Sequence, residues 1–473
     1  SIVGYGYQPV QRMYPQPGWV EQSPSAIAES VRQAIQIALS QARCSAQDVI
    51  ACGITSQRDT VIAWDQQSGR PIGNAITWQD LRTVPLVAEV DTWKHAAERR
   101  DRLGQFPGPY CSAMHMAWRM RHDTAFQNAA YEDRLAVSLV PGWLIQALGQ
   151  PVQHALDYSL MQGMTVLDFR RKQLWDDWID YLQLPRAALP QPVPTLSHFG
   201  EIEITDAQGT SASVPVLAMI SDQQAALFGY DCHSPGQASC THGTASFVNV
   251  VAGSTPPSQG IPKIYIGWEL EGVTTYCVEA DTTVTGAVVR WMQQDMGWFS
   301  DATQLGPLAQ TVPDAAGVTF VPAFTGLGVP LEDRRARGTL LGMTLDTKPA
   351  HIARAFLDSL GYQIYDILTT IQTETGLSID RLHVGGGVAA SDLACQVQAD
   401  ILSIPIVRAS NTETSVRAAA LLAGLGATLW PNTDALPRHT ATETVFEPQI
   451  SIDTRDNRLV VWHRALERAR EWA

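Results

Sequence analysis

Apolar and polar positions along this chain group into blocks that predict strands leading directly into helices. Val214 to Ile220 is a nearly unbroken apolar run, which is typical of a strand buried on both faces. Ser221 fits the N-cap of a following helix, Gln224 completes a capping-box pattern, and Gly229 suits the end of that helix. We therefore predict a junction between a buried strand and a helix, with Asp222 in the first turn of the helix.

The same patterns predict further elements on both sides of this junction. Ser23 and Pro24 mark the start of a helix over 23–39, and a long amphipathic helix is expected over 351–374. We also expect strands over 49–55, 60–64, 71–78 and 318–322, a largely helical region over 82–148, a strand–turn–strand unit over 237–251, and a strand, a triple-glycine loop and a helix from 382 onward. Strands followed by helices in both halves predict an α/β fold, and 473 residues are too many for one core, so about two domains are expected.

The composition excludes several classes of function. A formal net charge of −14 argues against a nucleic-acid partner and against an acidic membrane surface. No apolar run approaches the roughly 18 residues that a membrane-spanning helix needs, and no basic stretch precedes an apolar one at the start, so neither membrane insertion nor a signal peptide is predicted. The seven cysteines form no Cys-x-x-Cys pair, which indicates reduced thiols in a cytoplasmic protein rather than disulfides or metal clusters.

Charged residues that follow two predicted strands are candidates for chemistry. Asp222 lies beside unpaired backbone N–H groups at a helix start, which keep its carboxylate ionised and able to accept a proton from a substrate hydroxyl. An aspartate there also fits a helix cap with no chemical role. Arg58 and Asp59 follow the strand over 49–55, where an ion pair in a loop is the simpler interpretation. The residues alone leave these alternatives open.

Glycine turns in the second half fit a phosphate ligand. The Gly243-Thr244 turn offers free backbone N–H groups and a hydroxyl, and Gly385 to Gly387 precede a helix N-terminus that favours an anion. Gly-Thr turns are nevertheless common in hairpins, and a glycine triplet also permits tight packing of a strand on a helix. The pattern is neither a Walker A loop, since no Gly-Lys-Ser/Thr follows, nor a complete Gly-x-Gly-x-x-Gly motif.

Several motifs, taken together, resemble one protein family. They are Tyr14-Pro-Gln-Pro-Gly-Trp-Val-Glu21, Gly53-Ile-Thr-Ser-Gln-Arg-Asp-Thr60, Asn74-Ala-Ile-Thr-Trp78, Ser221-Asp-Gln-Gln-Ala-Ala-Leu-Phe-Gly229, Pro322-Ala-Phe-Thr-Gly-Leu-Gly328 and Ala336-Arg-Gly338. In this order, from about Ile2 to Trp430, the chain is similar to the FGGY carbohydrate kinases, and most similar to those members that phosphorylate glycerol.

The resemblance implies a fold and an activity. The family folds as two actin-like (ribonuclease H-like, ASKHA) α/β domains with the active site in the cleft between them. Residues 1–230 would form the polyol-binding N-terminal domain, without the family's first strands, and residues 231–473 the nucleotide-binding C-terminal domain, with a hinge near 229–235. The implied reaction is ATP- and Mg²⁺-dependent phosphorylation of a small polyol, glycerol first of all, which yields glycerol 3-phosphate.

The resemblance also implies residue roles. Asp222 matches the general base that takes the proton from the hydroxyl being phosphorylated. Positions that hold glycerol are matched by Arg58, Asp59, Trp78, Tyr110, Gln223 and Phe247, together with Asp222. Positions around the ATP phosphates and the nucleotide are matched by Gly243, Thr244, Gly286, Arg290, Gly386, Gly387 and Ser391. A donor, an acceptor and an apolar wall are what a small triol requires of its site.

The departures from the family leave two other functions open. The family begins with an Asp-x-Gly-Thr turn that binds phosphate and organises Mg²⁺, whereas residues 1–11 contain no such turn and no acidic residue. We therefore expect either a trimmed chain or a natural fragment, and a fragment would be a catalytically impaired, kinase-like binding protein. Asp59 stands where members that use glycerol carry Glu. The shorter aspartate side chain would leave room for a larger substrate, such as a tetritol or a pentulose.

Other departures concern the nucleotide side, regulation and assembly. Gly385, Arg290, Ser391 and Ala418 differ from the residues usual in members that use glycerol. The segment 206–213 lacks the Arg with which bacterial members bind a sugar-bisphosphate inhibitor, so we expect that regulation to be absent. A C-terminal amphipathic helix over 457–472 could pack on its own domain, which we expect, or on a second subunit, so a homo-oligomer is left open.

Overall fold

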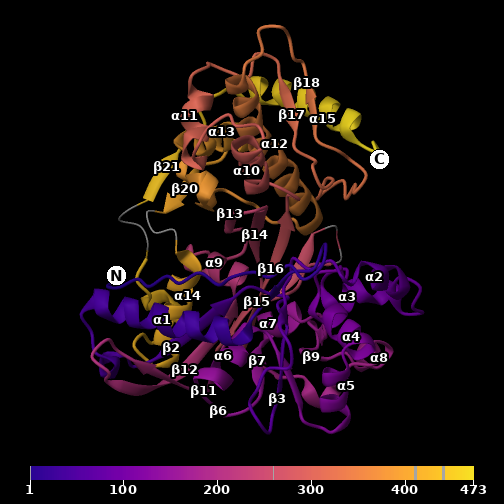
Figure 1. Cartoon of the computed structure of the whole chain (residues 1–473). Coiled ribbons are helices and arrows are strands. Elements are labelled where there is room, and N and C mark those ends of the chain that lie inside the picture. The colour runs from indigo at the N-terminus through magenta and orange to yellow at the C-terminus, as the bar shows by residue number, and fades with distance from the viewer. Residues whose placement is uncertain (1, 259, 261, 410–412, 439–442) are drawn as a thin grey trace. The chain divides into compact units, whose positions relative to one another are not determined.

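Figure 1 shows the computed structural model, which describes residues 2–258, 260, 262–409, 413–438 and 443–473. Its contacts divide the chain into two units. The first consists of Ser1–Ala225, Tyr265–Tyr276 and Ser415–Pro437, and the second of Ala226–Ile264, Cys277–Thr414 and Arg438–Ala473. Both units combine helices with sheets, in agreement with the predicted α/β class. The domain boundary at residue 230 stays a prediction, because each unit draws on separated parts of the chain.

The first unit contains one mixed sheet, several two-stranded sheets and the helices around them. Its strands are β1 (Glu21–Gln22), β2 (Cys52–Ser56), β3 (Ile62–Asp65), β4 (Ala75–Ile76), β5 (Leu135–Ser138), β6 (Gly149–Pro151), β7 (Ala155–Asp157), β8 (Leu167–Asp168), β9 (Gln173–Leu174), β10 (Gln191–Val193), β11 (Leu196–Thr205) and β12 (Ser211–Ser221). Its helices are α1 (Pro24–Ala42), α2 (Val84–Val90), α3 (Arg99–Leu103), α4 (Ser112–His122), α5 (Thr124–Tyr131), α6 (Val140–Leu148), α7 (Tyr158–Gly163), α8 (Asp176–Tyr181) and α14 (Thr414–Gly426). Helix α9 (Asp222–Gly229) begins in this unit and ends in the second.

A four-stranded sheet in the order β2-β12-β11-β6 organises the first unit. β11 and β12 form a long antiparallel hairpin, because the Asp206 carboxylate accepts hydrogen bonds from the N–H groups of Gln208 (3.0 Å) and Thr210 (2.9 Å) in its turn. The strand predicted over 214–220 is therefore confirmed but begins three residues earlier. Its side chains are buried on both faces only over 218–221, and alternate between buried and more exposed positions before that.

The second unit is built on a seven-stranded sheet in the order β15-β16-β14-β13-β19-β20-β21. Its strands are β13 (Ala238–His242), β14 (Ser246–Gly253), β15 (Lys263–Leu270), β16 (Val273–Asp281), β17 (Thr319–Val321), β18 (Thr339–Leu341), β19 (Leu382–Gly386), β20 (Ile406–Ala409) and β21 (Glu443–Phe446), of which the β15–β16 hairpin extends into the first unit. Its helices are α10 (Gly286–Gln294), α11 (Leu305–Gln310), α12 (Pro349–Thr375), α13 (Asp392–Leu402) and α15 (Ile452–Ala469).

The core of the second unit lies between this sheet and the long helix α12. Cys240, Val248 and Val384 from the sheet pack with Ile364 and Ile367 of α12 in one buried cluster. Helices α12 and α13 lie against each other (Figure 1), because Gly361 has no side chain at their contact. A Cβ atom at Gly361 would come within 3.2 Å of the Ile401 side chain. The adjacent central strands β13 and β19 therefore pack against α12 and α13.

The element predictions were confirmed where the signal was local. Helix α1 begins after Ser23, whose hydroxyl accepts a hydrogen bond from the N–H of Ala26 at 3.3 Å, and the hairpin over 237–251 is β13 and β14. The region over 82–148 is largely helical as predicted, but it also contains β5, which pairs with β3. All four residues of β5 are buried, so its apolar run has no alternation to separate it from a buried helix.

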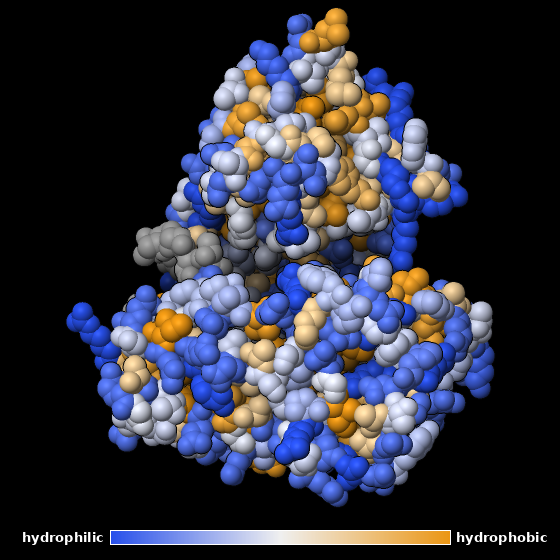
Figure 2. Space-filling model, in the orientation of Figure 1, coloured by the Kyte–Doolittle hydropathy of each residue, from blue (hydrophilic) through white to orange (hydrophobic). Residues whose placement is uncertain are grey.

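The surface is mostly polar in the view that the figures share. Figure 2 shows hydrophilic residues surrounding scattered small groups of hydrophobic ones. Among the helices of the described residues, none combines the length and the apolar character needed to cross a membrane.

The C-terminal helix α15 packs on its own unit, as expected. Leu459, Trp462 and Leu466 lie in a buried cluster with Val321 and Tyr362. The indole of Trp462 stacks on the ring of Tyr362 with a centroid distance of 5.4 Å, and its N–H donates to the Asp366 carboxylate at 2.8 Å. The apolar face of α15 is therefore used within the second unit.

We predict that Trp462→Ala destabilises the second unit. Trp462 is 1% exposed, and deletion of a buried aromatic side chain costs about 3–5 kcal/mol in the free energy of unfolding. The measurement is urea unfolding followed by circular dichroism. Val460→Ala is the matched control, because Val460 lies on the same helix but is 59% exposed. Equal midpoints for the two variants would contradict the packing of α15 described here.

We also predict that stability falls in mild acid. Burial lowers the pKa of His115 in α4 and of His242 in β13 from 6.5 to about 4. Between these two values the unfolded chain binds protons that the folded chain does not, so the free energy of unfolding decreases as the pH is lowered from about 6.5 to about 4. Urea unfolding at several pH values in this range measures the slope.

His115→Leu isolates one contribution to that slope. The comparison is needed because burial raises the pKa of Asp157 to about 7, which stabilises the folded chain as the pH falls through the same range. The variant should lose stability less steeply than the parent between about pH 6.5 and 4. Identical slopes would mean that the His115 imidazole is not held neutral by burial.

Candidate active site

Two neighbouring parallel strands end at one edge of the first unit's sheet. β12 pairs with β2 in parallel, so that Ile220 lies opposite Thr55 and Ser221 opposite Ser56. The residues that follow these strands, Asp222 on one side and the segment with Arg58 on the other, leave the sheet at the same edge. The carboxyl ends of parallel strands are where α/β folds place their ligands. The register therefore unites two of the predicted site segments.

Asp222 is the first residue of α9 and is half-buried. Its Oδ1 accepts a hydrogen bond from the N–H of Gln223 at 2.8 Å, so the carboxylate faces the start of the helix, where negative charge is favoured. The predicted capping box takes a different form. The N–H of Ser221 donates to the Ser159 hydroxyl at 3.0 Å, and the Ser221 hydroxyl bonds the Gln224 side chain instead of the helix backbone.

Buried groups behind this junction hold it in place. Ser159 donates its hydroxyl to the carboxylate of Asp157, which caps α7 and also accepts from Thr195 at 3.2 Å. Burial raises the pKa of Asp157 to about 7, because its hydrogen bonds offset only part of the cost of desolvation. The strand end that carries Asp222 is therefore fixed to α7 by polar contacts that water does not reach.

Arg58 is held between a glycine and an aromatic ring. A Cβ atom at Gly163 would come within 3.1 Å of the Arg58 side chain, so only glycine leaves room for this packing. On the other side, the guanidinium carbon lies 4.5 Å from the ring centroid of Tyr265, and the Tyr265 hydroxyl donates to Gln105 at 2.7 Å. This contact with the Tyr265 ring restricts the position of the Arg58 guanidinium, whose N–H donors lie in the plane of the guanidinium group.

Asp59 is buried and has a left-handed backbone with φ of 60°. Its Oδ1 accepts a hydrogen bond from the N–H of Ser112 at 3.2 Å, at the start of α4. Tyr110, two residues before Ser112, is half-buried, so the same contact brings it into this neighbourhood. Val61 and Ile76 exchange backbone hydrogen bonds of 3.1 and 3.2 Å, which brings the segment ending at Trp78 alongside the segment that starts at Asp59.

The remaining predicted polyol residues differ in their placement. Trp78 is 36% exposed, so its indole offers an accessible apolar face. Gln223 is half-buried, and its Oε1 atom is buried without a hydrogen-bond partner among the described residues. Phe247 lies in the second unit, on β14 opposite Thr241. The first unit therefore collects all the predicted polyol residues except Phe247.

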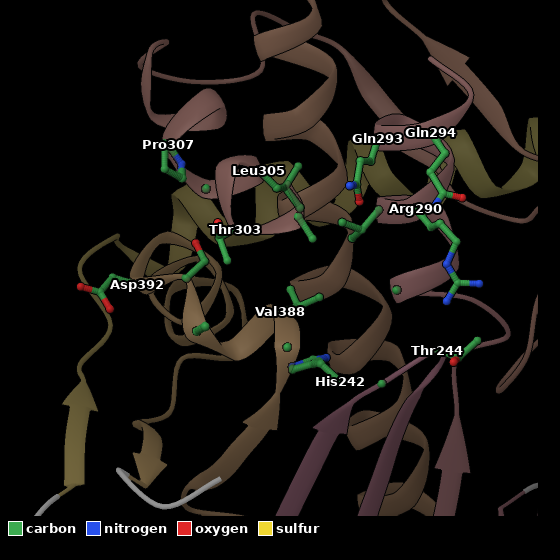
Figure 3. Close-up of a pocket in the computed structure, with 18 of the residues that line it drawn as sticks. His242, Thr244, Arg290, Gln293, Gln294, Thr303, Leu305, Pro307, Val388 and Asp392 are labelled. Carbon is green, nitrogen blue, oxygen red and sulfur yellow. The ribbon is translucent and has the colours of Figure 1, made fainter. Parts of the chain in front are cut away.

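The second unit contains a cavity of about 800 Å³ (Figure 3). It is lined by His242, Gly243, Thr244, Gly286, Val289, Arg290, Gln293, Gln294, Ala302, Thr303, Leu305, Gly306, Pro307, Gln310, Gly387, Val388, Ala390, Ser391 and Asp392. Its volume lies in the range of pockets that hold a cofactor-sized ligand. Six of the predicted nucleotide residues line it, and Gly386 lies directly behind.

Glycines shape the walls of this cavity. A Cβ atom at Gly286 would lie 2.6 Å from the Gly243 carbonyl oxygen, so α10 can approach the turn only with glycine there. Gly386 has φ of 86°, and a Cβ atom would come within 2.3 Å of the His242 carbonyl oxygen. A Cβ atom at Gly387, by contrast, would meet nothing within 4 Å, because this glycine faces the open cavity. A side chain at Gly387 would occupy space in the cavity that a ligand could otherwise fill.

The Gly243-Thr244 turn is tied to the start of α10. The N–H of Thr285 donates to the Thr244 carbonyl at 2.8 Å, and the N–H of Gly286 donates to the Gly243 carbonyl at 3.0 Å. The N–H of Gly243 donates to Ala245 within the turn at 2.9 Å, so the prediction that this N–H is free was wrong. A tight turn satisfies its own donor first. Thr244 is exposed, and Figure 3 shows the Arg290 guanidinium pointing toward it.

The sequence missed much of the cavity wall. Gln293 and Gln294 follow Gly286 and Arg290 on α10 at helical spacing, so the period of 3.6 residues could have identified them. Residues 302–310, by contrast, reach the cavity only through the packing of α11, and no motif marks them.

The described residues contain no cluster of three or more His, Cys, Asp or Glu side chains that could bind a metal ion.

Comparisons with known proteins agree over the whole chain. The model of the FGGY family of carbohydrate kinases, N-terminal domain, matches residues 1–229, and that of the C-terminal domain matches residues 238–427. Glycerol kinase 2 of Sulfolobus acidocaldarius and glycerol kinase of Dechloromonas aromatica are each 37% identical over 474 residues, which cover 100% of this chain and 94% of theirs.

Solved structures agree with the fold. Plasmodium falciparum glycerol kinase with ADP has a TM-score of 0.87 at 25% identity and covers 98% of this chain and 92% of its own. Xylulose kinase from Rhodospirillum rubrum has a TM-score of 0.80 at 21% identity, covers 97% of this chain and 92% of its own, and shows the fold alone. This chain therefore belongs to the FGGY family of carbohydrate kinases and has its two-domain, actin-like fold.

Proposed function

We propose that this protein transfers a phosphoryl group from ATP to glycerol and releases glycerol 3-phosphate, with Asp222 as the general base. Two observations support the substrate and the base. Relatives that are 37% identical over 94% of their own length are glycerol kinases, and the parallel pairing of β12 with β2 brings Asp222 to the sheet edge that also carries Arg58.

The first unit would bind and activate the polyol. Arg58, which packs against Tyr265, donates to one hydroxyl, and the Asp59 carboxylate accepts from a neighbouring hydroxyl. Trp78 covers the carbon chain of the substrate. Asp222 accepts the proton of the hydroxyl that attacks, and such a base contributes about 10²–10⁴-fold to the rate.

The second unit would bind ATP in the 800 Å³ cavity. The Thr244 hydroxyl and the Arg290 guanidinium contact the phosphates, and Gly387 lets the nucleotide lie close to the backbone. Mg²⁺ that binds together with ATP would neutralise charge on the phosphates. In the first unit, Asp222 is the carboxylate near the substrate hydroxyl that reacts. The residues of both units mainly align the reactants, as a loose phosphoryl-transfer transition state requires.

Asp59 supports a second candidate substrate. Its side chain is one methylene shorter than that of the Glu expected in a glycerol-phosphorylating member, and its carboxylate accepts a hydrogen bond from the Ser112 N–H at the start of α4. The extra space would admit a tetritol or a pentulose. A kinase-like protein that binds a polyol without transferring phosphate is the third alternative, and the experiment below separates all three.

The thiols support a cytoplasmic location, which we propose with the function. All seven cysteines are free, and five of them are buried. Unpaired thiols are typical of a reducing compartment.

We predict that Asp222→Asn abolishes most of the turnover. Asparagine caps a helix about as well as aspartate, so the fold is kept, but the amide cannot take a proton. The kcat should fall by about 10²–10⁴-fold with little change in the KM for the polyol. A coupled assay of ADP release in the presence of glycerol, erythritol, xylulose or ribulose measures both constants.

Turnover of the four phosphoryl acceptors by the parent and by Asp222→Asn distinguishes the three proposed functions. Turnover with glycerol that depends on Asp222 supports the proposal, and turnover only with erythritol or a pentulose supports the second substrate class. Binding of glycerol without turnover supports the kinase-like binding protein. Full activity of Asp222→Asn would reduce Asp222 to a helix cap.

We further predict that Gly387→Val weakens ATP binding. The new side chain would occupy cavity space that is open beyond the Gly387 backbone. Overlap of this kind costs about 1–3 kcal/mol, so the KM for ATP should rise about tenfold or more, and Gly387→Ala should give a smaller rise. The KM for the polyol serves as the internal control and should stay unchanged. A rise in that constant alone would place the nucleotide elsewhere.

A further inference from the structure

Behind the Gly243-Thr244 turn, buried polar side chains form one continuous hydrogen-bonded chain. Its members come from α13, from both strands of the hairpin and from the loop before α10, and each is at most 4% exposed: Gln398, His242, Ser246, Thr285 and Thr282. The successive distances are 3.1 Å from Gln398 Oε1 to His242 Nε2, 2.7 Å from His242 Nδ1 to Ser246 Oγ, 2.7 Å from Ser246 Oγ to Thr285 Oγ1, and 3.0 Å from Thr285 Oγ1 to Thr282 Oγ1. None of these groups has a role in the proposed reaction so far.

The contacts of Gln398 determine which atom donates in each of these hydrogen bonds. The Gln398 amide N–H donates to the Ala394 carbonyl at 3.0 Å, so its Oε1 must accept from His242 Nε2. A neutral imidazole then has only an acceptor left at Nδ1, and this atom accepts the hydroxyl proton of Ser246. Burial lowers the pKa of His242 to about 4, so the ring is neutral near neutral pH. Each donor in this chain therefore meets an acceptor.

These hydrogen bonds connect three walls of the cavity. His242 directly precedes the turn, and Ser246 begins the strand that follows it. Thr285 directly precedes Gly286, and its own N–H donates to the Thr244 carbonyl. Gln398 lies on α13, whose first residue, Asp392, lines the cavity. Figure 3 shows His242 below Val388 at the base of the view.

We propose that His242 is a positioning residue for the nucleotide phosphates: it holds the Gly243-Thr244 turn in place by accepting the Ser246 hydroxyl and anchors it to α13 through Gln398. The proposal rests on the proposed function in one respect, that ATP occupies this cavity. Both ring nitrogens of His242 are engaged within the protein, so the imidazole acts through the turn and donates no hydrogen bond to the phosphates.

Two substitutions of His242 separate its two hydrogen bonds. In His242→Asn, the amide oxygen lies one atom beyond Cγ, as Nδ1 does, so it can accept from Ser246 while the link to Gln398 is lost. In His242→Gln, the longer amide can reach Gln398, but the acceptor for Ser246 is lost. Loss of the Ser246 link leaves the Ser246 hydroxyl bonded to Thr285 alone, so the turn loses its contact with the imidazole. We expect this loss to lower the affinity about tenfold where the turn contacts ligand.

The experiment is calorimetric titration of each variant with ATP and Mg²⁺ in the absence of any polyol, together with its melting temperature. We expect His242→Gln to weaken ATP binding about tenfold and His242→Asn to weaken it clearly less. Ser246→Ala, which removes the same link from the other side, should weaken ATP binding by itself but add little to His242→Gln. The KM for glycerol should stay unchanged in all these variants.

His154→Gln is the matched control. His154 is a largely buried histidine of the first unit, whose ring bonds the carbonyls of Val137 (3.0 Å) and Ala188 (3.2 Å). This variant should lose stability and keep its affinity for ATP. If neither His242→Gln nor His242→Asn lost affinity for ATP, or if both lost only thermal stability as His154→Gln does, the positioning role would be refuted while ATP binding by the parent still stood. Absence of ATP binding by the parent would refute the proposed function as well.

Discussion

The parallel pairing of β12 with β2 is the constraint on which the polyol side of the site depends. Both strands end at the same edge, with Ser221 opposite Ser56, so Asp222 and the Arg58 segment emerge together. A shift by one residue would turn every side chain of β12 to the other face of the sheet. The register is secured by the burial of residues 218–221 and by the hydrogen bond from Ser221 to Ser159. The placement of Asp222 beside the Arg58 segment is therefore a consequence of how the core packs.

The second unit meets a different requirement with different means. A polyphosphate requires close approach of the backbone, and Gly387, which faces the open cavity, provides it, while Gly286 and Gly386 let the backbone segments around the cavity pack closely on one another. Glycine also has more backbone conformations than other residues, so the Gly243-Thr244 turn must be held in place by contacts with neighbouring elements. Backbone bonds from α10 hold the turn from one side, and the buried chain through His242 and Ser246 holds it from the other. Rigidity is supplied by neighbours because the glycines cannot supply it.

Buried polar groups serve both halves of the site in the same way. Asp157 and Ser159 lie behind Asp222, and His242 and Ser246 lie behind Thr244. In each case burial shifts a pKa toward the neutral form, up to about 7 for Asp157 and down to about 4 for His242. The His242 imidazole is therefore neutral near neutral pH and adds no charge beside the Gly243-Thr244 turn, whereas Asp157 is partly ionised there.

Local order in this protein could be predicted from its residues, because caps, turns and hydrophobic periods act over a few positions. The α1 start at Ser23, the strand–helix junction at Asp222 and the β13–β14 hairpin all follow from such signals. Tertiary structure alone decided which partner each group takes. The N–H of Ser221 bonds Ser159, β5 pairs with β3, and α11 lines the cavity of the second unit. These contacts join residues distant in the chain or compete with local ones, and their outcome depends on packing that no short stretch of sequence encodes.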